Sequence, residues 1–503
     1  MLLILLTIVI IALATYLYLK PLIDNLFYSV PHEPKYIHSY TPFVGFGLKM
    51  FNDPIEFIRS FYLKYGKTFV IYLAAKRWVY FYDEQTFLTK VLKSSDLSID
   101  EFIIDASVYG LSVSRQCVEN EDIQQITLKQ YHQYLIGDEL EILNKHVHDS
   151  LIESIKLDAK KGQDNQTRIV NLFDYFGEFM LYAGAEGLFG HSFVIEQRNA
   201  TPNFYKLFQE FGDACRLSFL RIPFRSILHK STFQSRLEFV KRFSSLKLNN
   251  GESKLIHARE ELFRSDKYKH LFSQYDIGAL QAGILWAAVV NTAIMSCWSL
   301  VDLLLHPEAL EAVKQELKEN ISSSSTLIYD KETLAKLKIL ESCINESMRH
   351  IFNTVSARQA KIDTIIECLD KTKVGLRKGD MLVYPTFLKH FDPNLFGPNP
   401  YEYQYDRFIK KPNEPKAPSV MLFGCGPHMC PGRFLAINEI KMLITVIIQH
   451  MDIEFVNMTE QDKDDYRKKL PYDYTKMISS GGPKKGYEHK FDIKYSYKNL
   501  DIE

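Results

Sequence analysis

The stretch Phe423-Gly-Cys-Gly-Pro-His-Met-Cys-Pro-Gly-Arg433 decides the fold, because it places reactive cysteines among residues that force a tight turn. Its three glycines and two prolines predict a loop, and the apolar pattern from Phe434 to His450 predicts a helix directly after it. A cysteine at a helix start is stabilised as a thiolate, the form that binds a metal, by the helix dipole and free backbone N–H groups. Glycines at 426 and 432 let a flat cofactor approach the backbone.

Two other interpretations of this stretch remain open from the residues alone. The first is a turn that buries two cysteines, and the second is a zinc site formed by Cys425, His428 and Cys430. Structural zinc prefers four ligands in paired spacings, and no second Cys/His pair completes such a set. The missing pair counts against zinc, and the turn with two buried cysteines stays open.

The stretch resembles the haem-binding signature of the cytochrome P450 family, Phe-x-x-Gly-x-Arg/His-x-Cys-x-Gly, which is matched here by Phe423, Gly426, His428, Cys430 and Gly432. The resemblance implies that Cys430 is the thiolate ligand of the iron of haem b. It also implies that His428 contacts a haem propionate, that Phe423 packs beside the sulfur, and that Cys425 is a bystander. An axial thiolate favours O–O cleavage when the surrounding loop controls its hydrogen bonds.

Further motifs stand in the order that this family requires. Taken alone, Glu346-x-x-Arg349 would be an ion pair on a solvated helix face. However, Tyr405-Asp-Arg407-Phe408 lies between this pair and Cys430, so the resemblance implies a buried triad of Glu346, Arg349 and Arg407 that fixes the loop beneath the haem. It also implies that Arg358 binds a propionate, and His390-Phe-Asp-Pro393 matches the usual lead-in.

The uncharged run from Ile277 to Val301 predicts a buried central helix rather than a membrane span, because it contains several polar side chains that would need partners in lipid. Within it, Ala288-Val-Val-Asn-Thr292 resembles the family's oxygen-activating motif. Val289 replaces the usual glycine and Asn291 replaces the usual acid. The resemblance implies that Thr292 and Asn291 order a water for proton delivery, whereas a satisfied polar group in a helix is the plainer interpretation of Asn291.

A propionate-binding Trp-x-x-x-Arg is missing from residues 121–137, so the sequence leaves the propionate contacts of that region open. The pattern Leu285-Trp-Ala with Trp298-Ser-Leu resembles the branch of the family with cholesterol 7α-hydroxylase, oxysterol 7α-hydroxylases, sterol 12α-hydroxylase and prostacyclin synthase. Most substrate contacts come from variable loops, so the substrate itself is not predicted.

The N-terminal run from Met1 to Leu19 is uncharged and nearly as long as a membrane-spanning helix, so we expect a retained anchor over residues 1–20. A cleaved signal peptide is the alternative, but it would need a basic start and a small-residue cleavage site. A proline-containing linker over 21–34 and one haem-thiolate catalytic domain over 35–503 follow. Lys20 and Lys35 after the run weakly favour a cytosolic body on the endoplasmic reticulum membrane.

The fold expected from these patterns is mainly α with a small β subdomain, the cytochrome P450 fold. Strands are expected over Thr68 to Leu73 and Trp78 to Tyr82, and helices over Leu135 to Leu157 and Pro307 to Asn320. Lysine plus arginine equals aspartate plus glutamate at 61 each, which argues against a nucleic-acid partner. Seven cysteines without regular spacing argue against a disulfide framework.

The function implied by the resemblance is a monooxygenase that hydroxylates a sterol, an oxysterol or another large lipid. It would use O2 and electrons that NADPH-cytochrome P450 reductase passes to the haem. One alternative keeps the fold but rearranges a lipid peroxide without a reductase, as prostacyclin synthase does. Another, from a different class, is a non-enzymatic haem or zinc binding protein.

Overall fold

A computed structural model describes most of the chain. The described residues are 15, 16, 19, 23, 27–39, 46, 50, 53–73, 76–161, 168–219, 227, 229–246, 248, 251–321, 328–352, 355–410, 419–473 and 481–498. Nearly all of the anchor expected over residues 1–20, the Asn-x-Thr sequence at Asn165 and residues 322–327 lie outside them.

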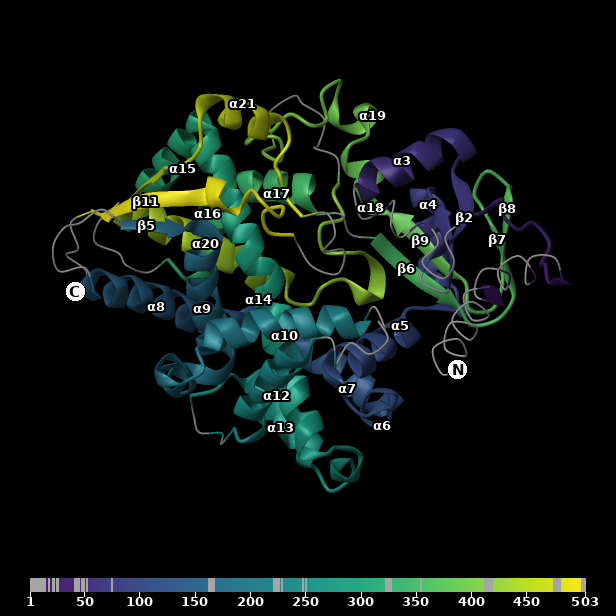
Figure 1. The fold of residues 1–503 in the computed structure, drawn as a ribbon, viewed down its shortest axis with the longest axis horizontal. Helices are drawn as coiled ribbons and strands as arrows, with labels where there is room; N and C mark the ends of the chain where they lie inside the picture. Colours follow the sequence, from purple (N-terminus) through teal and green to yellow (C-terminus); the bar gives the residue numbers. More distant parts are fainter. Residues whose placement is uncertain are drawn as a thin grey trace, which may run out of the picture.

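The described chain is mostly helical with a smaller content of strands, as the sequence predicts (Figure 1). Its helices are α3 (Pro54–Tyr65), α4 (Glu84–Thr89), α5 (Asp100–Asp105), α6 (Arg115–Val118), α7 (Glu121–Tyr134), α8 (Gly137–Lys161), α9 (Leu172–Asn199), α10 (Phe204–Phe219), α12 (Lys230–Ser244), α13 (Lys254–Arg264), α14 (Gln274–Leu305), α15 (Pro307–Asn320), α16 (Lys331–Lys336), α17 (Lys338–Ile351), α18 (Thr386–His390), α19 (Pro393–Phe396), α20 (Arg433–His450) and α21 (Glu460–Lys468). Its strands are β1 (Tyr36–Ile37), β2 (Thr68–Leu73), β3 (Lys76–Phe81), β4 (Leu97–Ser98), β5 (Arg168–Asn171), β6 (Val355–Ala360), β7 (Thr364–Glu367), β8 (Lys373–Leu376), β9 (Met381–Pro385), β10 (Met451–Phe455) and β11 (Asp492–Tyr497).

The boundaries of helices and strands agree closely with the predicted ones where residues such as proline mark an end. Strand β2 and helix α15 have the predicted bounds, and the latter carries its proline in the first turn. The helix expected from Leu135 begins at Gly137 instead, because that glycine has a φ of +63° and separates α7 from α8.

The largest sheet joins strands from the N-terminal part of the chain to two strands that lie between residues 355 and 385. It has six strands in the order β1-β2-β3-β9-β6-β4, in which β2 and β3 form an antiparallel hairpin and β9 runs parallel to β3. Trp78 pairs with Met381, and Arg358 on β6 pairs with Leu382 on β9. Figure 1 shows these strands gathered to one side of the helices. The sheet therefore holds Arg358 in a fixed register.

The described end of the expected linker lies against this β-rich part. The N–H of Gly375 donates to the carbonyl of His32 at 2.8 Å, and Glu33 forms an ion pair with Arg377. A Cβ on Gly375 would lie 2.1 Å from the carbonyl oxygen of Pro31, so this close approach requires glycine. The domain boundaries at residues 20 and 34 stay predictions.

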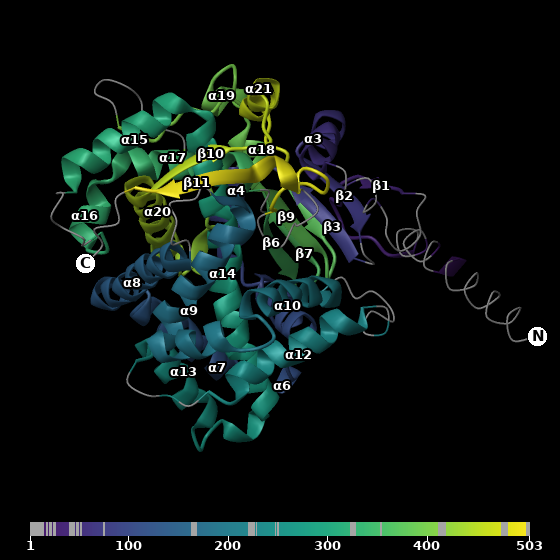
Figure 2. The ribbon, with the colours of Figure 1, turned by 60° about the vertical axis from the view of Figure 1, so that its left-hand side comes forward.

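Helix α14 occupies the centre of the helical part, where it contacts α9, α12, α17 and α20 (Figures 1 and 2). Ser273 and Asp276 form a capping box at its start. Among the described helices it is the one long and apolar enough to cross a membrane, and 61% of its most apolar window is buried inside the protein. Buried Gln281 accepts a hydrogen bond from Arg259 and donates one to Glu260, which satisfies the polar group inside the core. The predicted buried central helix is thus present.

Candidate functional site

The loop 423–433 folds back on itself directly before α20. The N–H of Cys430 donates to the carbonyl of Phe423 at 2.9 Å, and residues Gly426–His428 form a single 3-10 turn between them. Gly424 and Gly426 have φ values of +74° and +73°, which a side chain would disfavour. A Cβ on Gly426 would also lie 2.9 Å from Leu92, so the turn itself requires this glycine.

Cys430 presents a half-buried thiol three residues before the start of α20. Burial raises its pKa, while the N–H of Gly432 and the positive charge of Arg433 act in the opposite direction. Arg433 also donates to the carbonyl of Cys430 at 3.0 Å, so it buttresses the loop. Sequence reasoning assigned no role to Arg433, although its place directly after Cys-Pro-Gly could have suggested one. All seven cysteines are free, which confirms that the chain has no disulfide framework.

The other cysteine of the loop, Cys425, packs against the six-stranded sheet and not beside Cys430. It is buried beneath the six-stranded sheet in a cluster with Met421, and its sulfur lies 3.6 Å from the hydroxyl of Ser356. Within the described part of the chain, Cys425, His428 and Cys430 do not form a group with the spacing of metal ligands. The geometry does not favour the zinc interpretation.

The guanidinium of Arg358 lies near the ring of His428 in the loop, where its charge acts on that imidazole. The guanidinium of Arg358 on β6 is buried, and its Nη1 donates to the carbonyl of Ala357 at 2.7 Å. Its Nη2 is solvent-excluded and has no hydrogen-bond partner among the described residues. The pKa of His428 is lowered by its burial and by the charge of Arg358, while Asp100 acts in the opposite direction. A buried guanidinium nitrogen with free bonding capacity fits an anionic cofactor group such as a carboxylate.

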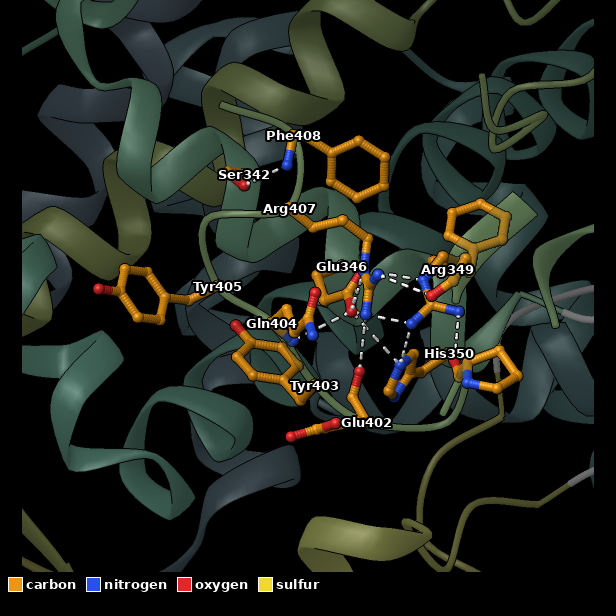
Figure 3. Close-up of polar contacts among 12 residues, drawn as sticks. Ser342, Glu346, Arg349, His350, Glu402, Tyr403, Gln404, Tyr405, Arg407 and Phe408 are labelled. Atoms are coloured by element: carbon orange, nitrogen blue, oxygen red, sulfur yellow. Dashed lines mark hydrogen bonds and ion pairs between the residues drawn. The ribbon is translucent and has the colours of Figure 1, made fainter. Parts of the chain in front are cut away.

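The structure brings Glu346, Arg349 and Arg407 together in a buried triad (Figure 3). Arg349 donates from Nε and Nη2 to the two oxygens of Glu346, both at 2.8 Å, and Arg407 donates from Nε to Oε1 at 2.9 Å. The N–H of Gln404 adds a fourth donor at 3.1 Å. Burial alone would raise the pKa of Glu346, but the hydrogen bond and the charges of the arginines bring it below the usual value.

His390 connects this triad to the cysteine loop. Its carbonyl accepts from Nη1 of Arg349 at 2.6 Å, and its ring Nε2 accepts from the N–H of Met421 at 3.2 Å, two residues before the loop begins. Burial, together with the charge of Arg349, lowers the pKa of His390 to about 3, so the ring is a neutral acceptor. The sequence marked His390 only as part of a motif, and its spacing gives no sign of this role.

One side of α14 is less covered than the rest of the helix. Six of its half-buried or exposed residues recur every three or four positions, which places these six on one face. They are Leu280, Ile284, Ala287, Ala288, Asn291 and Ile294. Thr292 borders this face and is 4% exposed, and its hydroxyl donates to the carbonyl of Ala288 at 2.8 Å. The polar pair of the predicted motif therefore lies on or beside the accessible face of an otherwise buried helix.

The unusual Val289 has its own packing partner. A Cβ on Gly184 of α9 would lie 2.6 Å from a methyl of Val289, so the valine occupies the space that this glycine leaves. Trp286 packs similarly against Gly212 of α10. The indole therefore lies between α14 and α10.

The region 121–137, where the expected propionate pair is missing, contains all of α7 and ends at the start of α8. Gln130 donates to the carbonyl of Ala258, and Tyr131 accepts from Arg259. Arg115, upstream on α6, is tied to Glu101 and Glu119. The propionate contacts of this region stay open.

Comparisons with known proteins agree with this geometry. The family model described as Cytochrome P450 matches residues 37–474. Cytochrome P450 7B1 of Mus musculus is 27% identical over 448 residues, which cover 85% of this chain and 86% of the relative. The 5-beta-cholestane-3-alpha,7-alpha-diol 12-alpha-hydroxylase of Sus scrofa is 26% identical over 475 residues, covering 90% and 91%. The cholesterol 7-alpha-monooxygenase of Cricetulus griseus is 26% identical over 451 residues, covering 84% and 87%.

A solved structure shares the fold. The retinoic acid bound cyanobacterial CYP120A1 superposes with a TM-score of 0.66 at 17% sequence identity, covering 93% of this chain and all of the other. The likeness at this identity concerns the fold alone.

Proposed function

Because the chain belongs to the cytochrome P450 family and is a cytochrome P450 monooxygenase, we propose that it hydroxylates a sterol or oxysterol with O2 and electrons from NADPH-cytochrome P450 reductase. The substrate class follows from the relatives, whose names describe hydroxylation of cholesterol and of cholestane derivatives. The single observation in the chain that supports the catalytic assignment is the Cys430 loop, closed by its own backbone and buttressed by Arg433.

The residues present fit haem, which the family implies. Cys430 would ligate the iron, and Arg358 and His428 would bind propionate groups, which would satisfy the partnerless Nη2 of Arg358. Bound there, haem supplies the redox chemistry for inserting oxygen into a C–H bond. Arg349 of the triad is bonded to His390, and His390 is bonded to Met421, so these contacts fix the position of the cysteine loop.

Thr292 and Asn291 would hold the water that delivers protons to the reacting oxygen. The hydroxyl of Thr292 can donate to Ala288 while its oxygen accepts from a water, and the amide of Asn291 offers both a donor and an acceptor. An amide does not ionise at working pH, so Asn291 would hold a water in place of releasing its own proton. This water would then pass a proton to the reacting O2 beside the accessible face of α14.

We expect the anchor over residues 1–20 to hold the catalytic domain at the cytosolic face of the endoplasmic reticulum membrane. Four of the five Asn-x-Ser/Thr sites lie in described parts of the chain, at Asn199, Asn320, Asn345 and Asn457. A cytosolic domain does not meet the glycosylation machinery, so none should carry a glycan. A mobility shift after glycosidase treatment would contradict this orientation.

The proposed activity is tested with the purified full-length, haem-loaded protein. The reduced, carbon monoxide-treated protein should show the spectrum of a haem thiolate, and NADPH with the reductase should yield hydroxylated product from a panel of sterols and oxysterols. Thr292→Ala should then consume NADPH and release hydrogen peroxide in place of product. Ser296→Ala is the matched control, because Ser296 is buried in the same helix and donates to the carbonyl four residues back at 2.8 Å.

Two results would overturn the proposal. One is conversion of a lipid peroxide without reductase by a protein that tolerates Thr292→Ala, which would indicate an isomerase. The other is a spectrum without haem thiolate, which would indicate a binding protein.

A further inference from the structure

Two glutamates and a histidine meet between α8 and α9, outside the residues used above. Glu153 comes from α8, and Glu186 and His191 come from α9. One possible ligand atom from each lies within 4.8 Å of the others. The Nδ1 of His191 is 3.2 Å from a carboxylate oxygen of Glu186 and 3.8 Å from one of Glu153.

A break in α9 creates this arrangement. Residues five apart in an uninterrupted helix point about 140° away from each other, so Glu186 and His191 would face different sides. Gly190 interrupts the helix with a φ of 80° and a ψ of 167°. A Cβ there would lie 2.4 Å from the carbonyl oxygen of Gly251, so the break depends on glycine in two ways.

One oxygen of each carboxylate lacks a hydrogen-bond donor, whereas the other oxygen of Glu186 faces Nδ1 of His191. The side chain of Glu186 is 8% exposed, and its Oε2 is solvent-excluded without a hydrogen-bond partner among the described residues. Oε2 of Glu153 is in the same condition. Burial raises the pKa of Glu186. The ammonium of Lys145, whose charge interacts with Glu186, donates to Asp149 of its own helix. Two such carboxylates require either a shared proton or a cation.

We propose that Glu153, Glu186 and His191 bind one zinc ion that links α8 to α9. An imidazole nitrogen with two carboxylate oxygens is a donor set that suits zinc, whereas calcium and magnesium prefer oxygen ligands alone. Zinc bonds of about 2.0–2.2 Å at tetrahedral angles put ligand atoms roughly 3.3–3.6 Å apart, a range that lies between the 3.2 and 3.8 Å separations around His191. The side chain of His191 is 59% exposed, so water can enter as the fourth ligand.

The site is tested on the haem-loaded full chain after dialysis against a chelator. Titration with zinc should bind one equivalent and raise the melting temperature, and cobalt should give the absorption bands of a tetrahedral site with a nitrogen ligand. Calcium should do neither. Glu186→Gln and His191→Ala should each weaken zinc binding by more than about 100-fold, since loss of an outer-sphere partner alone costs about 10–100-fold. Haem content should not change.

Matched controls are Glu196→Gln, an exposed acid in the same helix, and His132→Ala, an exposed histidine on α7. Both should bind zinc like the wild type. Zinc affinity that is equal in Glu186→Gln, His191→Ala and the wild type would overturn the proposal. So would a wild-type protein that takes up no zinc while Glu186→Gln raises its melting temperature, because the carboxylates would then share a proton.

Discussion

Replacing Glu346 with alanine should leave the protein largely without haem. The substitution removes the acceptor for four N–H groups, two from Arg349 and one each from Arg407 and Gln404. The remaining bonds of the arginines go to backbone carbonyls and to the ring of His350, whose pKa burial lowers to about 3, so none of these partners neutralises their charges. Since the side chains of Glu346 and Arg349 are 0% exposed, the loss matches a broken buried ion pair, about 3–5 kcal/mol.

A loss of this size is large beside a total stability of about 5–15 kcal/mol, and it acts on the support of the cysteine loop. The chain offers a matched control in Glu56-x-x-Arg59 on α3, which has the same spacing but side chains 64% and 40% exposed. Glu56→Ala should cost less than about 1 kcal/mol and leave haem content unchanged. Haem content per chain and urea midpoints of both variants make the comparison. Equal midpoints for Glu346→Ala and Glu56→Ala would refute the argument.

Three further predictions concern packing, pH and the loop. Gly184→Ala should lower the free energy of unfolding measured with urea, because overpacking against Val289 costs about 1–3 kcal/mol and outweighs the helix-propensity gain of about 1 kcal/mol. Adding Val289→Ala should restore the stability in the double variant. The folded pKa of His390, about 3, lies below its unfolded value of about 6.5, so stability should fall as pH drops through this window; His390→Asn, which keeps an acceptor, should flatten the profile of melting temperature against pH. Cys430→Ser should abolish the spectrum of the haem thiolate, whereas Cys425→Ser should retain it because the Cys425 side chain lies beneath the sheet. The reverse result would show that Cys425 is the haem ligand.

The sequence predicted the elements whose signals are local. A proline start defines α15, and a short continuous run of apolar and aromatic residues defines β2, so their bounds follow from neighbouring residues. The charge triad was accessible only through the family resemblance, because Glu56-x-x-Arg59 and Glu346-x-x-Arg349 are the same motif and burial alone distinguishes them.

Other features had no sequence signal. The acceptor role of His390 depends on a contact with a residue 31 positions away. The cluster around His191 depends on the backbone break at Gly190, and five-residue spacing in a helix argues against such a cluster. Long-range contacts and a single backbone dihedral are therefore what the sequence did not reveal.

The mixed pairing of the largest sheet has a consequence for synthesis on the ribosome. The β2–β3 hairpin emerges early, but its parallel partner β9 is encoded about 300 residues later, and translation at about 5–20 residues per second makes that about 15–60 s. Throughout this delay the β3 edge, with Val79 and Tyr80 that the finished sheet buries, has no native strand beside it. A nascent chain stalled before residue 381 would expose the unpaired backbone groups of the β3 edge, which can pair with other chains. A chaperone or the membrane surface would have to cover this edge until β9 pairs with it.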